Sequence, residues 1–296
     1  MKKKRAIIFG ASGQDGYYLN ELLIINKLEI INISRSAGDI IGDISDLNFV
    51  ENVIRKYNPS FIFHFAAISS TVHDTIFHNN QSIYIGTINI LESVRRFCPK
   101  SKIFLSGSAL QFKNNGTPID ENTPLDYSSP YSVSRTNSIN MGRYFREKFG
   151  INVYVGYFFN HDSPLRKENH INQKIVSFVK KIESGSTEKL VIGNMEARKE
   201  FNFAKDVVDA VWILVNQNLI FEAIIGSGLA YSIKDWVKYC FEQKKLNWEE
   251  FVITDNSYKS EYDILISNPT LIKKLGWLPK TSFFELADLM LETKSK

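Results

Sequence analysis

The strongest chemical signal in the chain is a glycine-rich segment near its start. Gly10, Gly13 and Gly16 follow the short apolar run at residues 6–9 and have the spacing GxxGxxG. A nucleotide pyrophosphate binds backbone N–H groups at a helix N-terminus, and it comes close enough only where no Cβ intervenes. A glycine-rich turn without a ligand is the alternative, because short glycine motifs are weak signals alone. The apolar run before the glycines and the helical pattern after them favour dinucleotide binding.

This spacing differs from the GxGxxG of many dehydrogenases and resembles that of the short-chain dehydrogenase/reductase superfamily. The resemblance implies a nicotinamide cofactor, bound by residues that include Gly10, Ser12, Gly13, Gln14, Asp15, Gly16, Asp43, Ala66 and Ala67. Arg35 follows the second predicted strand, where an NAD-selective site would place an acid, and it can pair with a 2′-phosphate. We therefore expect NADP(H), with NAD(H) as the alternative cofactor and a plain surface arginine as the other interpretation of Arg35.

The same resemblance implies a catalytic tyrosine with two partners. Tyr131 and Arg135 stand where the superfamily has Tyr-x-x-x-Lys, and a spacing of four puts both side chains on one helix face. Ser108 falls on the superfamily's Ser/Thr, whose hydroxyl hydrogen-bonds the substrate oxygen, although a one-residue shift would place Gly107 there. Arg135 keeps the positive charge beside tyrosine and cofactor but cannot give up a proton. The alternatives are a structural tyrosine at a helix start and a serine that caps a strand end.

Six segments carry a closer resemblance that runs nearly end to end: residues 13–19, 129–131, 158–166, 193–201, 204–206 and 275–283. They resemble the GDP-mannose 4,6-dehydratases and the related GDP-4-keto-6-deoxymannose reductases. This implies a GDP-sugar substrate, with Asn160 at the diphosphate or sugar, Lys174 at the guanine and Lys199 at a phosphate. It also implies that Arg166 lies on the nicotinamide side of the cofactor and that Ser69 contacts the substrate. Solvated helix and strand charges are the alternative for the two lysines.

Three departures from the dehydratases bear on the reaction. The dehydratases remove the C5 proton with a glutamate two residues after their Ser/Thr, and this chain has Leu110 there, which cannot act as a base. Their arginine before a late Glu-x-Asp element is replaced by Tyr258, with Lys259 beside it. The segment between the second strand and Gly42 is short and lacks the arginine-rich loop that the resemblance links to tetramers. A homodimer is therefore expected.

These departures favour redox chemistry over elimination. Hydride transfer at sugar C4 needs the cofactor, Tyr131 and a hydroxyl such as that of Ser108, whereas elimination across C5–C6 needs a further base. We expect a reductase of a GDP-4-keto-(6-deoxy) sugar in surface-polysaccharide precursor synthesis, with GDP-mannose 4,6-dehydratase as the close alternative. A non-catalytic protein that binds a nucleotide sugar or NADP(H) also stays open, because the family's lysine and glutamate are both replaced.

Apolar strand-like runs that alternate with helical patterns must position these residues. Strands are predicted at residues 6–9, 28–34, 61–66, 102–106 and 152–158, and helices at 17–26, 49–57, 81–97 and 131–149. This rhythm predicts an α/β fold, a Rossmann-type doubly wound parallel sheet with helices on both faces. After about residue 160 the elements are shorter, with helices at 171–183, 206–216 and 232–242. We expect a cofactor-binding domain at 1–160, completed by parts of 201–228, and a smaller intertwined sugar-nucleotide-binding part at 161–200 and 229–296.

Composition argues against several other classes. The 296 residues carry 36 Lys+Arg against 32 Asp+Glu, and a net charge of +4 is too weak to indicate a nucleic-acid partner. No run approaches about 18 apolar residues, so no membrane helix is expected. Cys98 and Cys240 lie far apart without CxxC spacing, which argues against a metal site and a disulfide framework. A cytoplasmic protein with reduced cysteines and no bound metal is expected.

Overall fold

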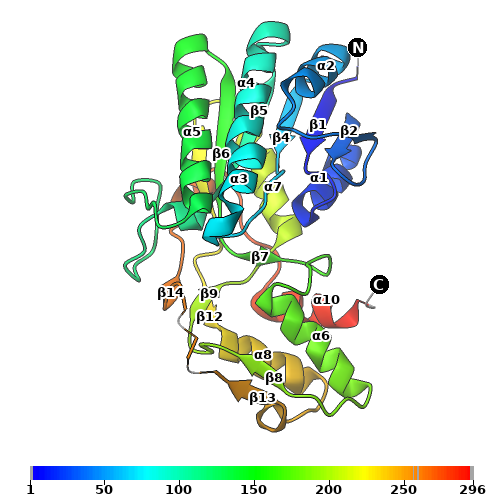
Figure 1. Ribbon diagram of the computed structural model, residues 1–296, viewed down its shortest axis with the longest axis vertical. Helices are drawn as coiled ribbons and strands as arrows, with labels where there is room; N and C mark the ends of the chain where they lie inside the picture. The colour runs from blue at the N-terminus through cyan, green and yellow to red at the C-terminus, as the bar shows by residue number, and fades with distance from the viewer. Residues whose placement is uncertain (1–2, 256, 259, 294–296) are drawn as a thin grey trace.

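The computed structural model describes residues 3–255, 257–258 and 260–293, and its main feature is a seven-stranded sheet (Figure 1). Its strands lie in the order β11-β6-β5-β4-β1-β2-β3, and every neighbouring pair is parallel. The predicted α/β fold of the Rossmann type is therefore confirmed. The strands are β1 (Arg5–Phe9), β2 (Glu29–Ser34), β3 (Ile40–Ile41), β4 (Phe61–His64), β5 (Lys102–Ser108), β6 (Asn152–Phe158) and β11 (Glu222–Ile225).

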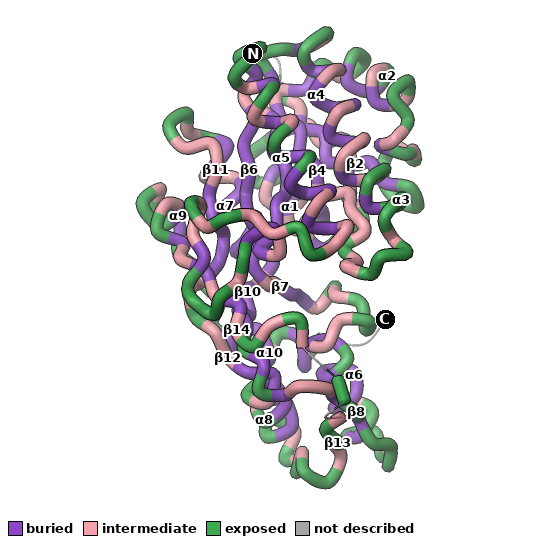
Figure 2. Tube along the Cα trace, turned by 60° about the vertical axis from the view of Figure 1, so that its left-hand side comes forward, coloured by how far each residue is buried: buried purple, intermediate pink, exposed green. Residues whose placement is uncertain are grey.

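Successive residues of the strands feed two apolar cores, one on each face of the sheet. Ile7 belongs to one core and Ile8 to the other, because neighbouring side chains of a strand point to opposite faces. Figure 2 shows the strands buried between the helices, which is the arrangement that parallel strands with crossover helices require. The helices are α2 (Leu47–Tyr57), α4 (Gly86–Phe97) and α5 (Pro130–Phe149) on the first face, and α1 (Gln14–Ile25) and α7 (Ala204–Val215) on the second.

Two of the differences from the sequence-based expectation have a clear structural cause. Strand β4 ends at His64 rather than at residue 66, because the N–H groups of Phe65 and Ala66 both turn to the carbonyl of Phe9. The helix predicted at 81–97 instead begins with α3 (Ile76–Asn79) and passes through a π-helical turn at Asn80–Ile85 before α4. A π turn adds one residue to the helical repeat, so the apolar pattern before it falls out of phase.

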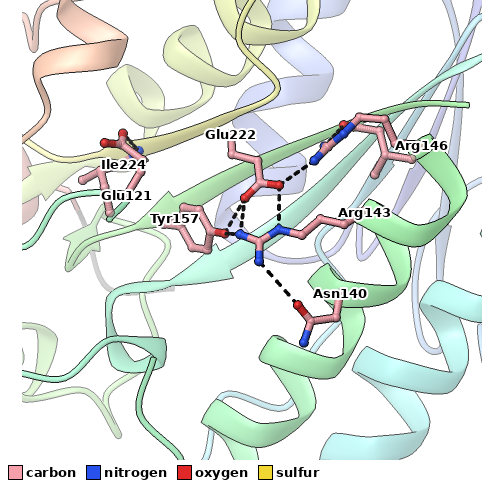
Figure 3. A network of polar contacts seen from close by, with 8 residues as sticks. Glu121, Asn140, Arg143, Arg146, Tyr157, Glu222 and Ile224 are labelled. Atoms are coloured by element: carbon pink, nitrogen blue, oxygen red, sulfur yellow. Dashed lines mark hydrogen bonds and ion pairs between the residues drawn. The ribbon is translucent and has the colours of Figure 1, made fainter. Parts of the chain in front are cut away.

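A partly buried ionic network holds α5 against the edge of the main sheet (Figure 3). Glu222 of β11 accepts hydrogen bonds from Arg143 at 2.9 and 2.6 Å and from Arg146 at 2.8 Å, both on α5. The Tyr157 hydroxyl of β6 donates to the same carboxylate at 2.7 Å. Burial disfavours the charged carboxylate, but the hydrogen bonds from the two arginines outweigh it and lower the pKa of Glu222 to about 2. The network thus fixes the helix that carries Tyr131.

The later part of the chain packs around a third apolar core, in which Trp236 is fully buried. In Figure 1 it lies below the main sheet, and the parallel pair β7 and β10, labelled in Figure 2, lies at the junction. Its strands have two or three residues each, too few for a period to be visible in the sequence. The later part of the chain comprises β7 (His161–Asp162), α6 (Ile171–Glu183), β8 (Leu190–Ile192), β9 (Arg198–Glu200), β10 (Asn202–Phe203), β12 (Ala230–Ser232), α8 (Ile233–Gln243), β13 (Val252–Thr254), β14 (Ile264–Leu265), α9 (Thr270–Lys274) and α10 (Phe283–Glu292). Of these, α9 packs on the second core through Ile272, and β14 adds Leu265 to the first.

Three further findings concern only the part of the chain that the structure describes. No helix there is long and apolar enough to span a membrane. No group of three or more His, Cys, Asp or Glu side chains there is arranged to hold a metal ion. Cys98 and Cys240 are both buried and free.

Candidate active site

The predicted cofactor and catalytic residues gather at the carboxyl ends of the central strands. β1 lies between β2 and β4, so the chain crosses to one side of β1 and later to the other. Such a switch point leaves a crevice at the carboxyl ends of the strands, where open α/β sheets bind ligands. Two adjoining cavities lie there, and both are lined by Gly13, Phe65 and Ala67.

The glycine-rich loop has the close backbone contacts that a pyrophosphate site needs. Gly10 has φ +90°, and a Cβ there would lie 2.5 Å from the backbone nitrogen of Ala66. A Cβ at Gly16 would lie 2.6 Å from the carbonyl oxygen of Gly10. Gly13 caps α1 without a side-chain hydrogen bond, which leaves backbone N–H groups at the helix N-terminus for an anion. The loop therefore fits a dinucleotide diphosphate.

The first of these cavities, about 310 Å³ in volume, is called here the cofactor cavity. It brings together seven predicted cofactor residues: Gly10, Ser12, Gly13, Arg35, Asp43, Ala66 and Ala67. Gly16 lies behind the loop and lines neither cavity. Lys167 and Ser82 also line the cofactor cavity, and sequence reasoning missed both. The basic pair at residues 166–167 was the only signal for Lys167.

The second cavity is called here the reaction cavity, and it contains the predicted catalytic residues. Ser108, Tyr131 and Arg135 line it, with the remaining predicted cofactor residues Gln14, Asp15 and Arg166 and the predicted substrate residues Ser69 and Asn160. The Asn160 amide oxygen is buried and has no hydrogen-bond partner among the described residues, so a ligand hydroxyl or N–H would satisfy it.

Tyr131 and Arg135 contact each other directly at the start of α5. The helix begins at a capping box formed by Ser129 and Ser132, which sets its first turn. Arg135 Nε donates to the Tyr131 hydroxyl at 3.2 Å, and both side chains are about 95% buried, at 5% and 6% exposure. Arg135 Nη1 donates to the backbone carbonyl and the hydroxyl of Ser106 on β5, the latter at 2.8 Å. The guanidinium therefore bridges the tyrosine and the central sheet, which a single ammonium would do less rigidly.

Ser108, and not Gly107, presents a hydroxyl to the reaction cavity. A side chain at Gly107 would point to the Tyr157 ring, because a Cβ there would lie 2.7 Å from it. Ser108 Oγ accepts from the backbone N–H of Leu110 at 3.3 Å, so its own proton is available for donation to a ligand. Leu110 lines the same cavity, at the position that corresponds to the dehydratase glutamate. The hydroxyls of Ser108 and Tyr131 therefore share the reaction cavity with the alkyl side chain of Leu110.

Lys199 and Lys174 line a third cavity, of about 520 Å³, called here the nucleotide cavity. Lys199 is only 8% exposed, and burial lowers its pKa to about 8 despite the nearby Asp162. Asp162 is itself paired with Arg166 at 2.9 Å. A buried ammonium of this kind favours an anionic ligand such as a phosphate. Lys174 is more exposed and donates to the Val191 carbonyl at 3.4 Å.

Tyr258 also lines the nucleotide cavity, where the resemblance had implied an arginine. Its ring covers Gly193, and a Cβ at that glycine would lie 2.3 Å from the ring. Tyr258 presents an aromatic face that remains 60% exposed and carries no positive charge. Lys259, the other residue noted there, lies outside the described residues.

Asp15 and His161 form a pair that sequence reasoning did not find. His161 Nε2 lies 3.0 Å from Asp15 Oδ1, and His161 Nδ1 lies 2.9 Å from the Phe159 carbonyl. Burial disfavours the charged imidazole, but Asp15 outweighs this and raises the pKa of His161. The pair joins the glycine-rich loop to the loop that carries Asn160. The only signal was that both lie in segments that carry the family resemblance.

Glu261 is a second site residue whose role was not predicted. It lines the nucleotide cavity and the reaction cavity, and Tyr262 does the same. Its carboxylate accepts from the Thr71 hydroxyl at 2.8 Å, from the loop that follows β4. This contact, across 190 positions of sequence, joins the two parts of the chain beside the site.

Comparison with known proteins gives one family. The family model for GDP-mannose 4,6 dehydratase matches residues 7–290. GDP-mannose 4,6 dehydratase 1 of Arabidopsis thaliana is 27% identical in an alignment 325 positions long. The alignment covers 98% of this chain and 89% of that protein. Among solved structures, RMD from Pseudomonas aeruginosa complexed with NADPH aligns with a TM-score of 0.87 at 17% identity, over 98% of both chains. The Thermus thermophilus UDP-glucose 4-epimerase complex with NAD aligns at 0.84 and 18% identity, over 97% of this chain and 98% of that one. At these identities the two structures bear on the fold alone.

Proposed function

The chain belongs to the GDP-mannose 4,6-dehydratase family, and from that premise we propose that it is an NADP(H)-dependent reductase of a GDP-linked 4-keto sugar. A GDP-sugar-modifying enzyme is the coarser statement that the family supports. The finer one, hydride transfer at C4 without elimination, rests on one observation. Tyr131 and Ser108 share the reaction cavity with Leu110, and no carboxylate stands at the position where the dehydratases keep their base.

The cofactor cavity fits the group that the reaction needs. Gly10 leaves room for a diphosphate beside the N-terminus of α1, and Arg35 and Lys167 supply positive charge at the rim. Both charges suit the 2′-phosphate that distinguishes NADP(H) from NAD(H). Bound there, NADP(H) would supply the hydride.

The chain's own residues handle the substrate oxygen and its proton. In a reduction, Ser108 donates a hydrogen bond to the C4 carbonyl oxygen and Tyr131 delivers the proton to it. Arg135 holds the tyrosine hydroxyl in place through the 3.2 Å contact but passes no proton, since a guanidinium stays charged. Lys199 and Asn160 bind the diphosphate and the sugar, which sets C4 against the two hydroxyls.

The 4,6-dehydratase remains the second candidate, because the matching family model and curated relatives carry that activity in their names. Elimination would need a carboxylate from elsewhere in the reaction cavity, which contains Asp15 and Glu261. Asp15 is paired with His161, whereas among the described residues Glu261 accepts a hydrogen bond from the neutral hydroxyl of Thr71. A non-catalytic nucleotide-sugar or NADP(H) binding protein is the third.

One pair of incubations separates these candidates. The protein is given GDP-4-keto-6-deoxymannose with NADPH, and separately GDP-mannose with NADP⁺, and the products are identified by mass spectrometry. The reductase consumes NADPH in the first tube and makes no 4-keto-6-deoxy sugar in the second. Formation of that product from GDP-mannose supports the dehydratase. Turnover in neither tube, while both nucleotides bind, supports the non-catalytic protein. Tyr131→Phe should abolish turnover, and the matched control is Tyr127→Phe, which changes an exposed tyrosine near the start of the same helix.

A further inference from the structure

The guanidinium of Arg135 is a buried cation without a carboxylate partner among the described residues. Asp15 lines the same cavity but is paired with His161. A buried charge is costly unless hydrogen bonds compensate for the water that it loses. Apart from the Tyr131 hydroxyl, the hydrogen-bond partners of this guanidinium belong to one residue, Ser106 of β5. The position of the cation therefore depends on Ser106.

The Ser106 hydroxyl has a fixed direction. Its oxygen donates to the backbone carbonyl of His64 at 2.9 Å, and this contact uses the only proton of the hydroxyl. The lone pairs of the oxygen remain, and Arg135 Nη1 donates to them at 2.8 Å and to the Ser106 carbonyl as well. Ser106 is only 4% exposed, so water does not compete for these contacts. The hydroxyl therefore orients the guanidinium and passes no proton to it.

The central sheet holds this hydroxyl in place. β4 ends at His64, whose partner on β5 is Leu105, so Ser106 is the first residue of β5 beyond the pairing with β4. Its side chain bonds to the last residue of the neighbouring strand and also lines the reaction cavity. The serine thus lies where the sheet ends and the site begins, and it is held by two strands.

Fixing one end of the guanidinium fixes the other. The group is planar and rigid, so the Ser106 contacts at Nη1 set the direction of Nε, which donates to the Tyr131 hydroxyl at 3.2 Å. Nη2 forms no hydrogen bond among the described residues and is left for the cofactor or the substrate. The ammonium of a lysine has three rotatable donors and does not need to be aligned in this way. An arginine at residue 135 needs an acceptor on the sheet.

We propose that Ser106 is the positioning residue for Arg135: its hydroxyl fixes the plane of the guanidinium and so aims Nε at the Tyr131 hydroxyl during hydride transfer. This inference rests on the proposed function and adds a residue to its site. Ser106 acts through Arg135 and takes no part in the proton transfer. The serine and the arginine form a matched pair, which adapts the site to the loss of the superfamily's lysine.

A double-mutant cycle tests the inference. Ser106→Ala removes the hydroxyl and keeps the carbonyl, and we expect kcat with NADPH and a GDP-4-keto sugar to fall by about tenfold or more, while KM for the sugar nucleotide changes less than about twofold. In the Arg135→Met background the same change should alter the rate by less than about twofold, because no guanidinium remains to be positioned. Single-turnover oxidation of NADPH measures all four proteins, since it follows slow variants too.

Ser101→Ala is the matched control. Ser101 is 2% exposed, and its hydroxyl donates to the Pro59 carbonyl just before the start of β5, at the end of the strand opposite the site. This variant removes an equally buried hydroxyl from a backbone carbonyl, and we expect kcat to stay at the parent value. Circular dichroism shows whether each variant folds.

The outcomes separate the inference from the proposed function. An equal loss of rate in the parent and Arg135→Met backgrounds, or no loss in either, overturns the inference and leaves the proposed function standing. If Ser106→Ala does not fold, Ser106→Cys enters the same cycle. A thiol accepts hydrogen bonds weakly, so we expect a loss of about threefold or more that disappears in Arg135→Met. A parent protein that oxidises no NADPH with the GDP-4-keto sugar contradicts the proposed function, and the inference with it.

Discussion

Arg135 Nε lies 3.2 Å from the Tyr131 hydroxyl while Nη1 of the same guanidinium is bound to Ser106 on the central sheet. One side chain thus orients the tyrosine and is itself fixed by a strand. This relationship explains how an arginine can stand where the superfamily has lysine.

Changing Arg135 should separate its charge from its shape. Arg135→Met removes both contacts, and we expect kcat for the GDP-4-keto sugar to fall by about 100-fold or more, because the tyrosine loses its orienting group. Arg135→Lys keeps the charge and should retain more activity than the methionine variant, though less than the parent. Steady-state kinetics with NADPH measures both. A lysine variant orders of magnitude faster than a near-inactive parent would mean that catalysis is not this protein's role.

Binding of the GDP-sugar should weaken as the pH rises through the range in which Lys199 loses its proton. Burial lowers the pKa of Lys199 to about 8, so the lysine is mostly charged at pH 7 and mostly neutral at pH 9. We expect kcat/KM to fall by about tenfold across that interval, as for a single group with this pKa. Lys199→Arg restores the residue that the resemblance implies and stays charged, so its profile should be flat there. The same fall in both proteins would assign the pH dependence to another group.

Arg35 should decide the choice between the two nicotinamide cofactors. It lines the cofactor cavity beyond the end of β2, where we propose that a 2′-phosphate binds. Arg35→Ser removes a charged hydrogen-bond donor, and we expect KM for NADPH to rise at least about tenfold while KM for NADH changes little. The measurement is the ratio of kcat/KM values for the two cofactors. An unaltered ratio would mean that Arg35 is a surface arginine that does not contribute to the choice of cofactor.

The network around Glu222 should matter for stability at neutral pH and not at strongly acid pH. Its folded pKa, about 2, lies below the ordinary value of 4.5, so its contribution is complete above about 4.5 and is lost as the pH falls towards 2. Because Glu222→Ala leaves Arg143 and Arg146 without their carboxylate, we expect a loss of about 2–3 kcal/mol in the free energy of unfolding at pH 7. Urea unfolding followed by circular dichroism measures this.

Glu29→Ala is the control for that variant, since it breaks an exposed pair with Arg5 and should cost under about 1 kcal/mol. Equal losses in the two variants would show that the network around Glu222 contributes no more than a surface ion pair.

The sequence predicted those features of the fold and the site that depend on a pattern within one short segment. Strand β6 has the predicted bounds, and the glycine loop sits between β1 and α1 because its backbone contacts need glycine at residues 10 and 16. The contact of Tyr131 with Arg135 follows from helical spacing. Spacing of this kind is visible in a single segment.

Contacts between segments that are distant in the sequence could not be predicted from such patterns. Asp15 meets His161, and Thr71 meets Glu261, only because the fold brings separate loops together. Lys167 reaches the cofactor cavity for the same reason. A further cavity, of about 520 Å³, is lined by the turns between β5 and α5 together with Thr71, Glu261, Tyr262 and Leu265. No periodicity in those turns indicates a cavity.

Transfer of deuterium tests the central claim most directly. The protein is incubated with NADPH that carries deuterium at the transferable position, together with a GDP-4-keto sugar, and the product is examined by mass spectrometry and NMR. The account predicts deuterium on C4 of a GDP-linked sugar in which the C4 ketone has become a hydroxyl, with none in Tyr131→Phe. Absence of the label from C4 in the parent, combined with release of water from a GDP-sugar supplied with NADP⁺, would contradict it.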